Sequence, residues 1–187
     1  MLKKELKSII DEEKILYTGA NYRYQKATLS KRYLIWRYLS YYRVSQYYRE
    51  KMQNVSGLNK YIIKLAYRYY VKKKNSYSYK SGVEIANNRL LGRRLDIWHS
   101  DVVINCHLGN DCVFHGHNIV GNKGLSKADE IPILGNNIDI GAGAVLIGNI
   151  RIADNCVIGS NAVVTKDVTT PGVTIVGVPG RRIDSPH

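Results

Sequence analysis

The chain of 187 residues is poor in cysteine and proline and has no long apolar run. None of its three cysteines forms a Cys-x-x-Cys pair, which argues against zinc or dithiol chemistry and predicts structural thiols at Cys106, Cys112 and Cys156. No run of 18 or more apolar residues is present, and the N-terminal MLKKELKSIIDEEK has no apolar core of a secretory signal. These absences predict a cytoplasmic protein.

Positive charge is concentrated in the first 80 residues. They hold 19 Lys or Arg against 5 Asp or Glu, whereas residues 81–187 hold 9 against 10. All 15 tyrosines also lie in the first 80 residues. Because the composition changes at Ser81 and Gly82, we predict a basic, Tyr-rich helical region at 1–80 and a second domain at 81–187.

Spacings of three and four residues predict two amphipathic helices in the basic region. The first is expected over residues 30–51 and the second over 61–74, with a turn at 54–59. The lysines at 72–74 suit a helix C-terminus because cations interact well with the helix dipole there. The expected apolar side of the second helix consists of Tyr61, Ile62, Leu65, Tyr69 and Tyr70.

Three roles stay open for the basic region. Its aromatic side chains could pack against the second domain or a neighbouring subunit while the cations stay in water. Basic helices with Trp and Tyr also suit an anionic membrane surface, so peripheral contact with the inner face of the cell membrane is a second expectation. Interleaved aromatics could hold a single nucleic-acid strand, but no known binding motif is present, and we predict no nucleic-acid partner.

Aliphatic residues recur every six positions in the second domain. A period of six fits neither an α-helix, with its period of 3.6, nor a half-buried strand, with its period of two. It fits a parallel β-helix in which each unit builds one flat face, three units make a coil, and the aliphatic side chain points into the core. The most regular stretch comprises Leu134, Ile140, Leu146, Ile152, Ile158 and Val164.

The repeat has two irregularities before it ends. Ile97 and Leu108 are eleven residues apart, whereas two six-residue units would place them twelve apart. One unit is therefore expected to be short by a residue just after His99. Val120 and Leu134 are fourteen residues apart instead of twelve, so two extra residues must project from the β-helix. Residues 122–130 (NKGLSKADE) are the expected extruded loop. Two prolines in TTPGVTIVGVPGRRID end the repeat and begin a C-terminal tail.

These segments resemble the hexapeptide-repeat acetyltransferases. IGAGAVLIGNIRIADNCVIGSNAVVTKDV is similar to their left-handed β-helix, and GVPGRRI to their closing motif. LDIWHSDVVIN and LGNDCVFHGHNIVGN resemble serine acetyltransferase-type enzymes of capsule and exopolysaccharide clusters. The resemblance implies a mainly β fold with an α-helical N-terminal region, a left-handed parallel β-helix and a homotrimer. It also implies an O-acetyltransferase with acetyl-CoA as co-substrate and no bound cofactor.

Acetyl transfer to an alcohol needs a positioned base, and histidine is well suited to that task. The resemblance places the base at His99 and its orienting carboxylate at Glu84, fifteen residues earlier. A carboxylate on one imidazole nitrogen fixes the tautomer and supports the imidazolium. A metal site of three histidines, as in the β-helical carbonic anhydrases, is the rival chemistry. The spacing of the metal ligands in those enzymes is absent here, so we predict no metal. The other histidines are His107, His115, His117 and His187.

For acetyl-CoA, the resemblance implies contacts from both small and charged residues. Small residues let the pantetheine arm approach the backbone, and the two cations can meet its phosphates. The implied residues are Ala142, Ser160, Thr165, Lys166 and Arg181.

The expected acceptor follows from departures from the serine enzymes. Those enzymes carry an Asp directly before the catalytic His and an Arg-His pair in the loop, whereas Trp98, Glu130 and Ile131 stand here. An indole beside the base suits stacking on a sugar ring, and His115 is expected to line the same site. We therefore expect a carbohydrate acceptor in surface polysaccharide biosynthesis. Serine O-acetylation in cysteine biosynthesis is the alternative, and a non-catalytic β-helix scaffold is a third possibility.

Overall fold

The computed structural model describes residues 2–124, 126 and 128–183, so that His187 lies outside the described residues. The chain folds into two compact units, Met1–Val83 and Glu84–His187. The division after residue 80 that the composition suggests stays a proposal about domain organisation.

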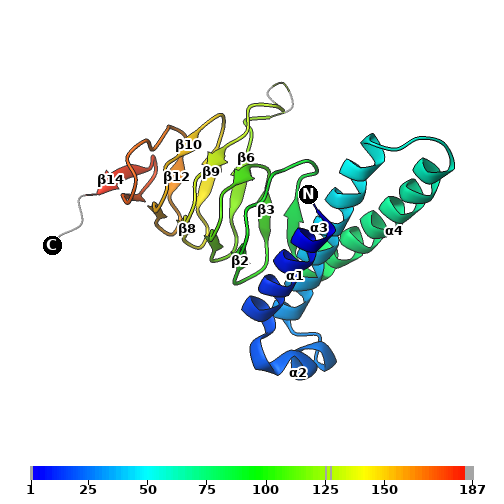
Figure 1. Cartoon of the computed structure of the whole chain (residues 1–187). Helices are drawn as coiled ribbons and strands as arrows, with labels where there is room; N and C mark the ends of the chain where they lie inside the picture. Colours follow the sequence, from blue (N-terminus) through cyan, green and yellow to red (C-terminus); the bar gives the residue numbers. More distant parts are fainter. Residues whose placement is uncertain (1, 125, 127, 184–187) are drawn as a thin grey trace. The chain divides into compact units, whose positions relative to one another are not determined.

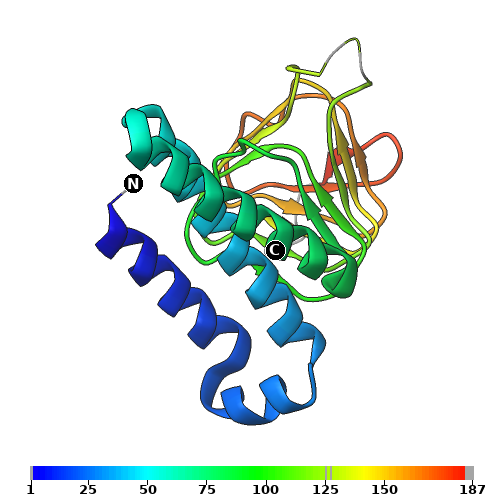
Figure 2. The same ribbon diagram turned by 90° about the vertical axis from the view of Figure 1, so that its right-hand side faces the viewer.

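The first unit is helical. The helices α3 and α4 run antiparallel as a hairpin (Figure 1), and α1 lies along α3 (Figure 2). Ser30 caps α3, since its side chain accepts a hydrogen bond from the Tyr33 amide at 3.2 Å. In the described part of the chain, no helix is both long and apolar enough to cross a bilayer. The elements are α1 (Lys3–Thr18), the short 3₁₀ helix η1 (Gly19–Asn21), α2 (Tyr22–Ala27), α3 (Lys31–Gln53) and α4 (Gly57–Ser81).

The second predicted helix is longer than the sequence suggested. It continues to Ser81, where Gly82 takes a left-handed conformation with φ of 68° and closes the helix. The three lysines therefore lie inside α4 and do not mark its end. Lys74 is buried, and its ammonium nitrogen lies 6.0 Å from the centre of the Tyr42 ring.

A buried ion pair joins α1 to α3. Glu13 is fully buried and Arg43 nearly so, and the Arg43 Nε donates to both carboxylate oxygens of Glu13, at 2.9 and 3.0 Å. No sequence pattern indicated this pair, because the two residues are thirty positions apart in a highly charged region. Aromatic and aliphatic side chains fill the rest of the core around it, chiefly Tyr33, Ile35, Trp36, Tyr38, Leu39 and Tyr42.

Most of the apolar side predicted for α4 does not pack. Tyr61, Ile62, Leu65 and Tyr69 are exposed. From the predicted side Tyr70 contacts α3, where its ring stacks on Tyr48 with centroids 5.4 Å apart, and a further ring contact comes from Tyr77, which lies 5.2 Å from Tyr41. Because α4 carries large apolar residues around most of its circumference, periodicity alone could not identify the buried side.

The second unit is a parallel β-helix with three faces, and Figure 1 shows its strands stacked coil upon coil. The five-stranded sheet has the order β1-β3-β6-β9-β12, formed by Val83–Ile85, Val102–Ile104, Ile119–Gly121, Val145–Ile147 and Val163–Val164. The three-stranded sheet has the order β10-β7-β4, formed by Arg151–Ile152, Ile133–Leu134 and His107–Leu108. The six-stranded sheet has the order β14-β13-β11-β8-β5-β2, formed by Arg181–Ile183, Thr174–Val176, Val157–Ile158, Asp139–Ile140, Val113–Phe114 and Asp96–Ile97.

The core matches the predicted repeat, and the predicted fold class is confirmed. Each of the six aliphatic residues of the regular stretch from Leu134 to Val164 is buried, and parallel pairing places equivalent residues of successive coils next to one another, such as Ile140 and Ile158. The three cysteines are free and buried among them. Burial raises the pKa of the Cys112 thiol to about 11 and that of Cys106 further, so both remain neutral in the fold.

The predicted position of the short unit is wrong. After Ile97 the next core residue at the repeat position is Ile104, seven positions on and paired with Val120, and Leu108, paired with Leu134, follows after only four. The turn that contains His99 is therefore long, and the short unit comes after Ile104.

The extruded loop leaves the coils between β6 and β7 (Figure 1). Val120 and Leu134 lie on adjacent faces of the β-helix, which one unit of six residues would connect. Their separation of fourteen residues therefore includes eight extra residues, more than the two expected from the sequence. The start of the loop is anchored, because the Asn105 side-chain amide donates to Oδ1 of Asn122 at 3.1 Å and Nδ2 of Asn122 donates to the backbone carbonyl of Gly124 at 2.8 Å.

The strand β14 pairs antiparallel with β13 and closes the C-terminal end of the β-helix.

Candidate functional site

One edge of the β-helix gathers most of the predicted site residues. It consists of the turns that lead from the six-stranded to the five-stranded sheet, at residues 98–101, 115–118, 141–144 and 159–162, which we call the histidine corner. Backbone hydrogen bonds stack these turns, and three of them run from His117 to Ser100, from Gly143 to Gly116, and from Asn161 to Ala142. His99, Trp98, His115, Ala142 and Ser160 thus lie on one edge in successive coils.

His99 is exposed in the first of these turns, directly against Gly116 of the next coil. A Cβ atom at position 116 would lie only 2.6 Å from the His99 Cβ, and Gly116 has a φ of 122°, which L side chains rarely adopt. Glycine at 116 therefore makes the room in which His99 sits. No sequence motif indicated this role for Gly116.

Trp98 and His115 form a tilted ring pair at the histidine corner. Their ring centroids are 4.4 Å apart at an interplanar angle of 37°. Nε2 of His115 lies 2.7 Å from Oδ1 of Asp139, an ion-pair distance without the geometry of a hydrogen bond. The indole nitrogen of Trp98 donates to Oδ2 of Asp96 at 3.0 Å. Two carboxylates thus flank the aromatic pair.

His117 has a weaker partner on the same edge. Its Nδ1 lies 3.6 Å from Oδ2 of Asp101, which also accepts a hydrogen bond from the Ser100 hydroxyl at 2.9 Å. Both His117 and Asp101 are largely exposed, so this pair contributes little to stability.

His107 lies outside the histidine corner. Its Nδ1 accepts a hydrogen bond from the Leu90 amide at 2.9 Å. Burial, with a smaller contribution from the nearby Arg89 cation, lowers the pKa of His107, which favours the neutral ring that this bond requires. His107 therefore has a structural role in joining two coils.

Glu84 lies on β1 with an exposed side chain. Among residues 2–124, 126 and 128–183, no hydrogen bond joins Glu84 to His99. The orienting role that the sequence suggested for Glu84 therefore stays a prediction.

The other residues expected to bind acetyl-CoA lie in the last coil and the C-terminal hairpin. Thr165 and Lys166 follow β12 and are exposed. Arg181 opens β14, opposite Val176 of β13, and is also exposed. Both cations are accessible to an anionic ligand.

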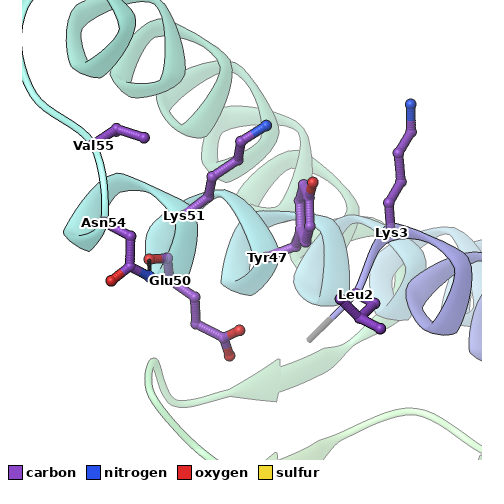
Figure 3. Close-up of a pocket in the computed structure, with 7 residues that line it drawn as sticks. All are labelled: Leu2, Lys3, Tyr47, Glu50, Lys51, Asn54 and Val55. Atoms are coloured by element: carbon purple, nitrogen blue, oxygen red, sulfur yellow. Dashed lines mark hydrogen bonds between the residues drawn. The ribbon is translucent and has the colours of Figure 1, made fainter.

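A hollow of about 380 Å³ lies in the helical unit, between the start of α1 and the end of α3 (Figure 3). None of its lining residues is a predicted site residue, and it offers no histidine or cysteine. We assign no chemistry to it. Its lining residues are Leu2, Lys3, Tyr47, Glu50, Lys51, Asn54 and Val55.

Within the described ranges, no three His, Cys, Asp or Glu side chains gather in a way that could hold a metal ion.

The chain is similar in sequence and in fold to serine acetyltransferases. No family model matches the chain. Over 106 residues it is 37% identical to a serine acetyltransferase from Synechococcus elongatus, covering 55% of this chain and 43% of that protein. The crystal structure of Neisseria gonorrhoeae serine acetyltransferase superposes with a TM-score of 0.69 at 26% identity, over 97% of this chain and 68% of that chain. A serine acetyltransferase in complex with CoA superposes with a TM-score of 0.63 at 23% identity, over 79% of this chain and 56% of that chain.

These comparisons support a hexapeptide-repeat acetyltransferase family for the chain, with the predicted left-handed β-helix and helical N-terminal region. The chain spans about half the length of the curated relatives it matches. The trimeric assembly stays a prediction.

The predicted carbohydrate acceptor and the role in surface polysaccharide biosynthesis are wrong, because the similar proteins named here are all serine acetyltransferases. The sequence has Trp98 where the serine enzymes carry the Asp that holds the amine. In the structure, however, Asp96 contacts Trp98 and Asp139 contacts His115, so that acidic groups remain at the histidine corner.

Proposed function

We propose that the chain is an acetyl-CoA-dependent serine O-acetyltransferase and acts in cysteine biosynthesis. The observation that carries the proposal is the position of His99, which is exposed on one edge of the β-helix in the space left by Gly116. Ala142 and Ser160, which the family resemblance assigns to acetyl-CoA, lie on the same edge. We infer L-serine as the acceptor from the similar proteins, because they are named serine acetyltransferases.

In this mechanism His99 is the general base. It takes the proton of the serine hydroxyl as the oxygen attacks the thioester carbonyl, and the CoA thiolate leaves and is then protonated. Glu84 is proposed to orient the imidazole and support its positive charge. Lys166 and Arg181 are exposed cations that would pair with the CoA phosphates.

The acceptor would lie against Trp98 and His115. The indole of Trp98 is about half exposed and can offer its face to the serine ammonium group, a cation–π contact. Asp139, held 2.7 Å from His115, adds negative charge beside that face. A zwitterionic amino acid thus finds a partner for its amine without an Asp directly before His99.

The homotrimer is also part of the proposal, because a neighbouring prism would complete the groove for acetyl-CoA. Light scattering at micromolar concentration should give about three times the mass of the 21.2 kDa chain. A monomeric mass would contradict this part of the proposal.

The test is a thiol-release assay with acetyl-CoA and L-serine on the purified chain. His99→Ala should lower kcat by at least about 10², the usual range for loss of a general base, with little change in acetyl-CoA binding. Glu84→Gln should lower it less, since the imidazole remains. His117→Asn is the matched control: it removes an exposed histidine from the same corner, and asparagine accepts its φ of 55°. Equal losses in His99→Ala and His117→Asn would argue against a specific base.

A further inference from the structure

The outward side of α4 carries a stripe of large apolar side chains. Their positions follow spacings of three and four residues, which places them along one face of the helix. Their exposed fractions run from 48% to 76%. Large apolar residues grouped on one exposed face indicate an interaction surface. We call this set the α4 stripe: Leu58, Tyr61, Ile62, Leu65 and Tyr69.

The charge of α4 has one sign. Its 25 residues include seven Lys or Arg and no Asp or Glu. Lys64, Arg68 and Lys72 follow Tyr61 at three, seven and eleven residues, so they lie along one edge of the α4 stripe, and all three are exposed. Lys74 is buried and takes no part in this surface. The stripe is therefore apolar along its middle and cationic along its edge.

We infer that the α4 stripe docks on an anionic lipid surface. A helix with an apolar face and flanking cations lies in the plane of a membrane, with the apolar side chains at the boundary of the acyl chains and the cations among the headgroups. Each Lys or Arg near such a surface raises the partition coefficient roughly fivefold. Since no described helix could cross a bilayer, the contact would be peripheral.

Charge and side-chain type favour lipid over other partners. A second copy of the chain would bring one α4, with seven cations and no acid, against another, and like charges oppose that contact. Nucleic acid would match the charge, but it uses aromatic rings for base stacking and gains little from Leu58, Ile62 and Leu65. An anionic lipid surface uses the aliphatic residues, the tyrosines and the cations together.

Vesicle flotation of the full chain tests the inference. At low salt the protein should float with vesicles of phosphatidylcholine containing one third phosphatidylglycerol and stay behind with pure phosphatidylcholine. The double variant Lys64→Gln, Arg68→Gln should bind roughly 25-fold more weakly, from about fivefold per cation. Ile62→Ser with Leu65→Ser should also weaken binding at least about tenfold, since it removes apolar area from the interface.

Matched controls separate this surface from net charge and general stickiness. Arg23→Gln with Lys26→Gln removes the same two charges from the exposed side of α2, and Leu90→Ser removes an exposed aliphatic residue from the β-helix. Both controls should bind anionic vesicles more tightly than the matching α4 variants do. Because all the substituted side chains are exposed, we expect every variant to fold. An unchanged helical circular dichroism signal would verify that the variants are folded.

Three results would overturn the inference. One is equal binding to anionic and neutral vesicles, and another is unchanged binding of both α4 variants. The third is a fall in the molecular mass of the assembly in the Ile62→Ser, Leu65→Ser variant, which would show that the α4 stripe joins copies of the chain. A lipid preference lost only in the α4 variants, at unchanged mass, would support it.

Discussion

Replacing Gly116 by alanine should disable the proposed base without touching it chemically. The new Cβ would lie 2.6 Å from the His99 Cβ, whereas ordinary van der Waals contact begins at 3.4 Å, so His99 must move by roughly 0.8 Å. A misplacement of about 1 Å in a reacting group can lower the rate about 10²-fold. We therefore expect kcat for O-acetylserine formation to fall about 10²-fold, with the KM for acetyl-CoA nearly unchanged.

The same substitution also places alanine at an unfavourable positive φ. A control variant must therefore have the same backbone strain but no steric clash with a histidine. Gly124 has a φ of 138°, close to the 122° of Gly116, and a Cβ there would meet nothing within 4 Å. Each alanine should cost about 1–3 kcal/mol of stability through its backbone conformation. Thermal unfolding should show this cost in both variants, but only Gly116→Ala should lose activity.

Steady-state kinetics of the two variants decide the matter. If Gly116→Ala keeps a kcat close to that of Gly124→Ala, then His99 either tolerates the displacement or is not the base, and the reasoning fails.

Three further predictions concern other parts of the chain. Lys166→Ala and Arg181→Ala should each raise the apparent KM for acetyl-CoA about tenfold, the effect of one lost charge-assisted contact of about 1.4 kcal/mol. Glu13→Gln should destabilise the helical unit by about 3–5 kcal/mol in urea unfolding followed by circular dichroism, because it leaves the Arg43 charge buried without its partner. The raised pKa of Cys112, about 11, should make stability fall as pH rises from about 9 to 11, since the fold favours the neutral thiol.

Each of these has its own control or contrary outcome. An unchanged KM in both cation variants would place the CoA phosphates elsewhere. Arg94→Gln breaks an exposed pair with Asp111 and should cost less than about 1 kcal/mol, so a similar loss in it and in Glu13→Gln would refute the burial argument. A melting temperature that stays constant from pH 9 to 11 in the wild type, or that falls equally in Cys112→Ala, would contradict the thiol prediction.

The β-helix could be predicted well because its rule is local. Every six residues an aliphatic side chain such as Ile140 or Ile158 must enter the core, so the period is visible in the sequence. The turns were harder, because a count of residues from Ile97 to Leu108 does not show which unit is short. Only the position of Ile104 places the long turn at His99.

The surroundings of the base depend on contacts between coils, which the sequence does not display. Asp139 comes close to His115 because β5 and β8 pair in parallel, although the two residues are 24 positions apart. Gly116 lies against His99 for the same reason, one coil away. The wrong acceptor followed from this gap, since the sequence showed Trp98 in place of one acid and did not show the carboxylates that gather beside it.

The most direct test of the central claim is product analysis by mass spectrometry after incubation of the purified wild-type chain with acetyl-CoA and L-serine. We expect O-acetyl-L-serine in an amount equal to the CoA thiol released, and no such product from His99→Ala on the same time scale. Thiol release that is no faster with L-serine than without it, in a protein shown to bind acetyl-CoA, would contradict the account.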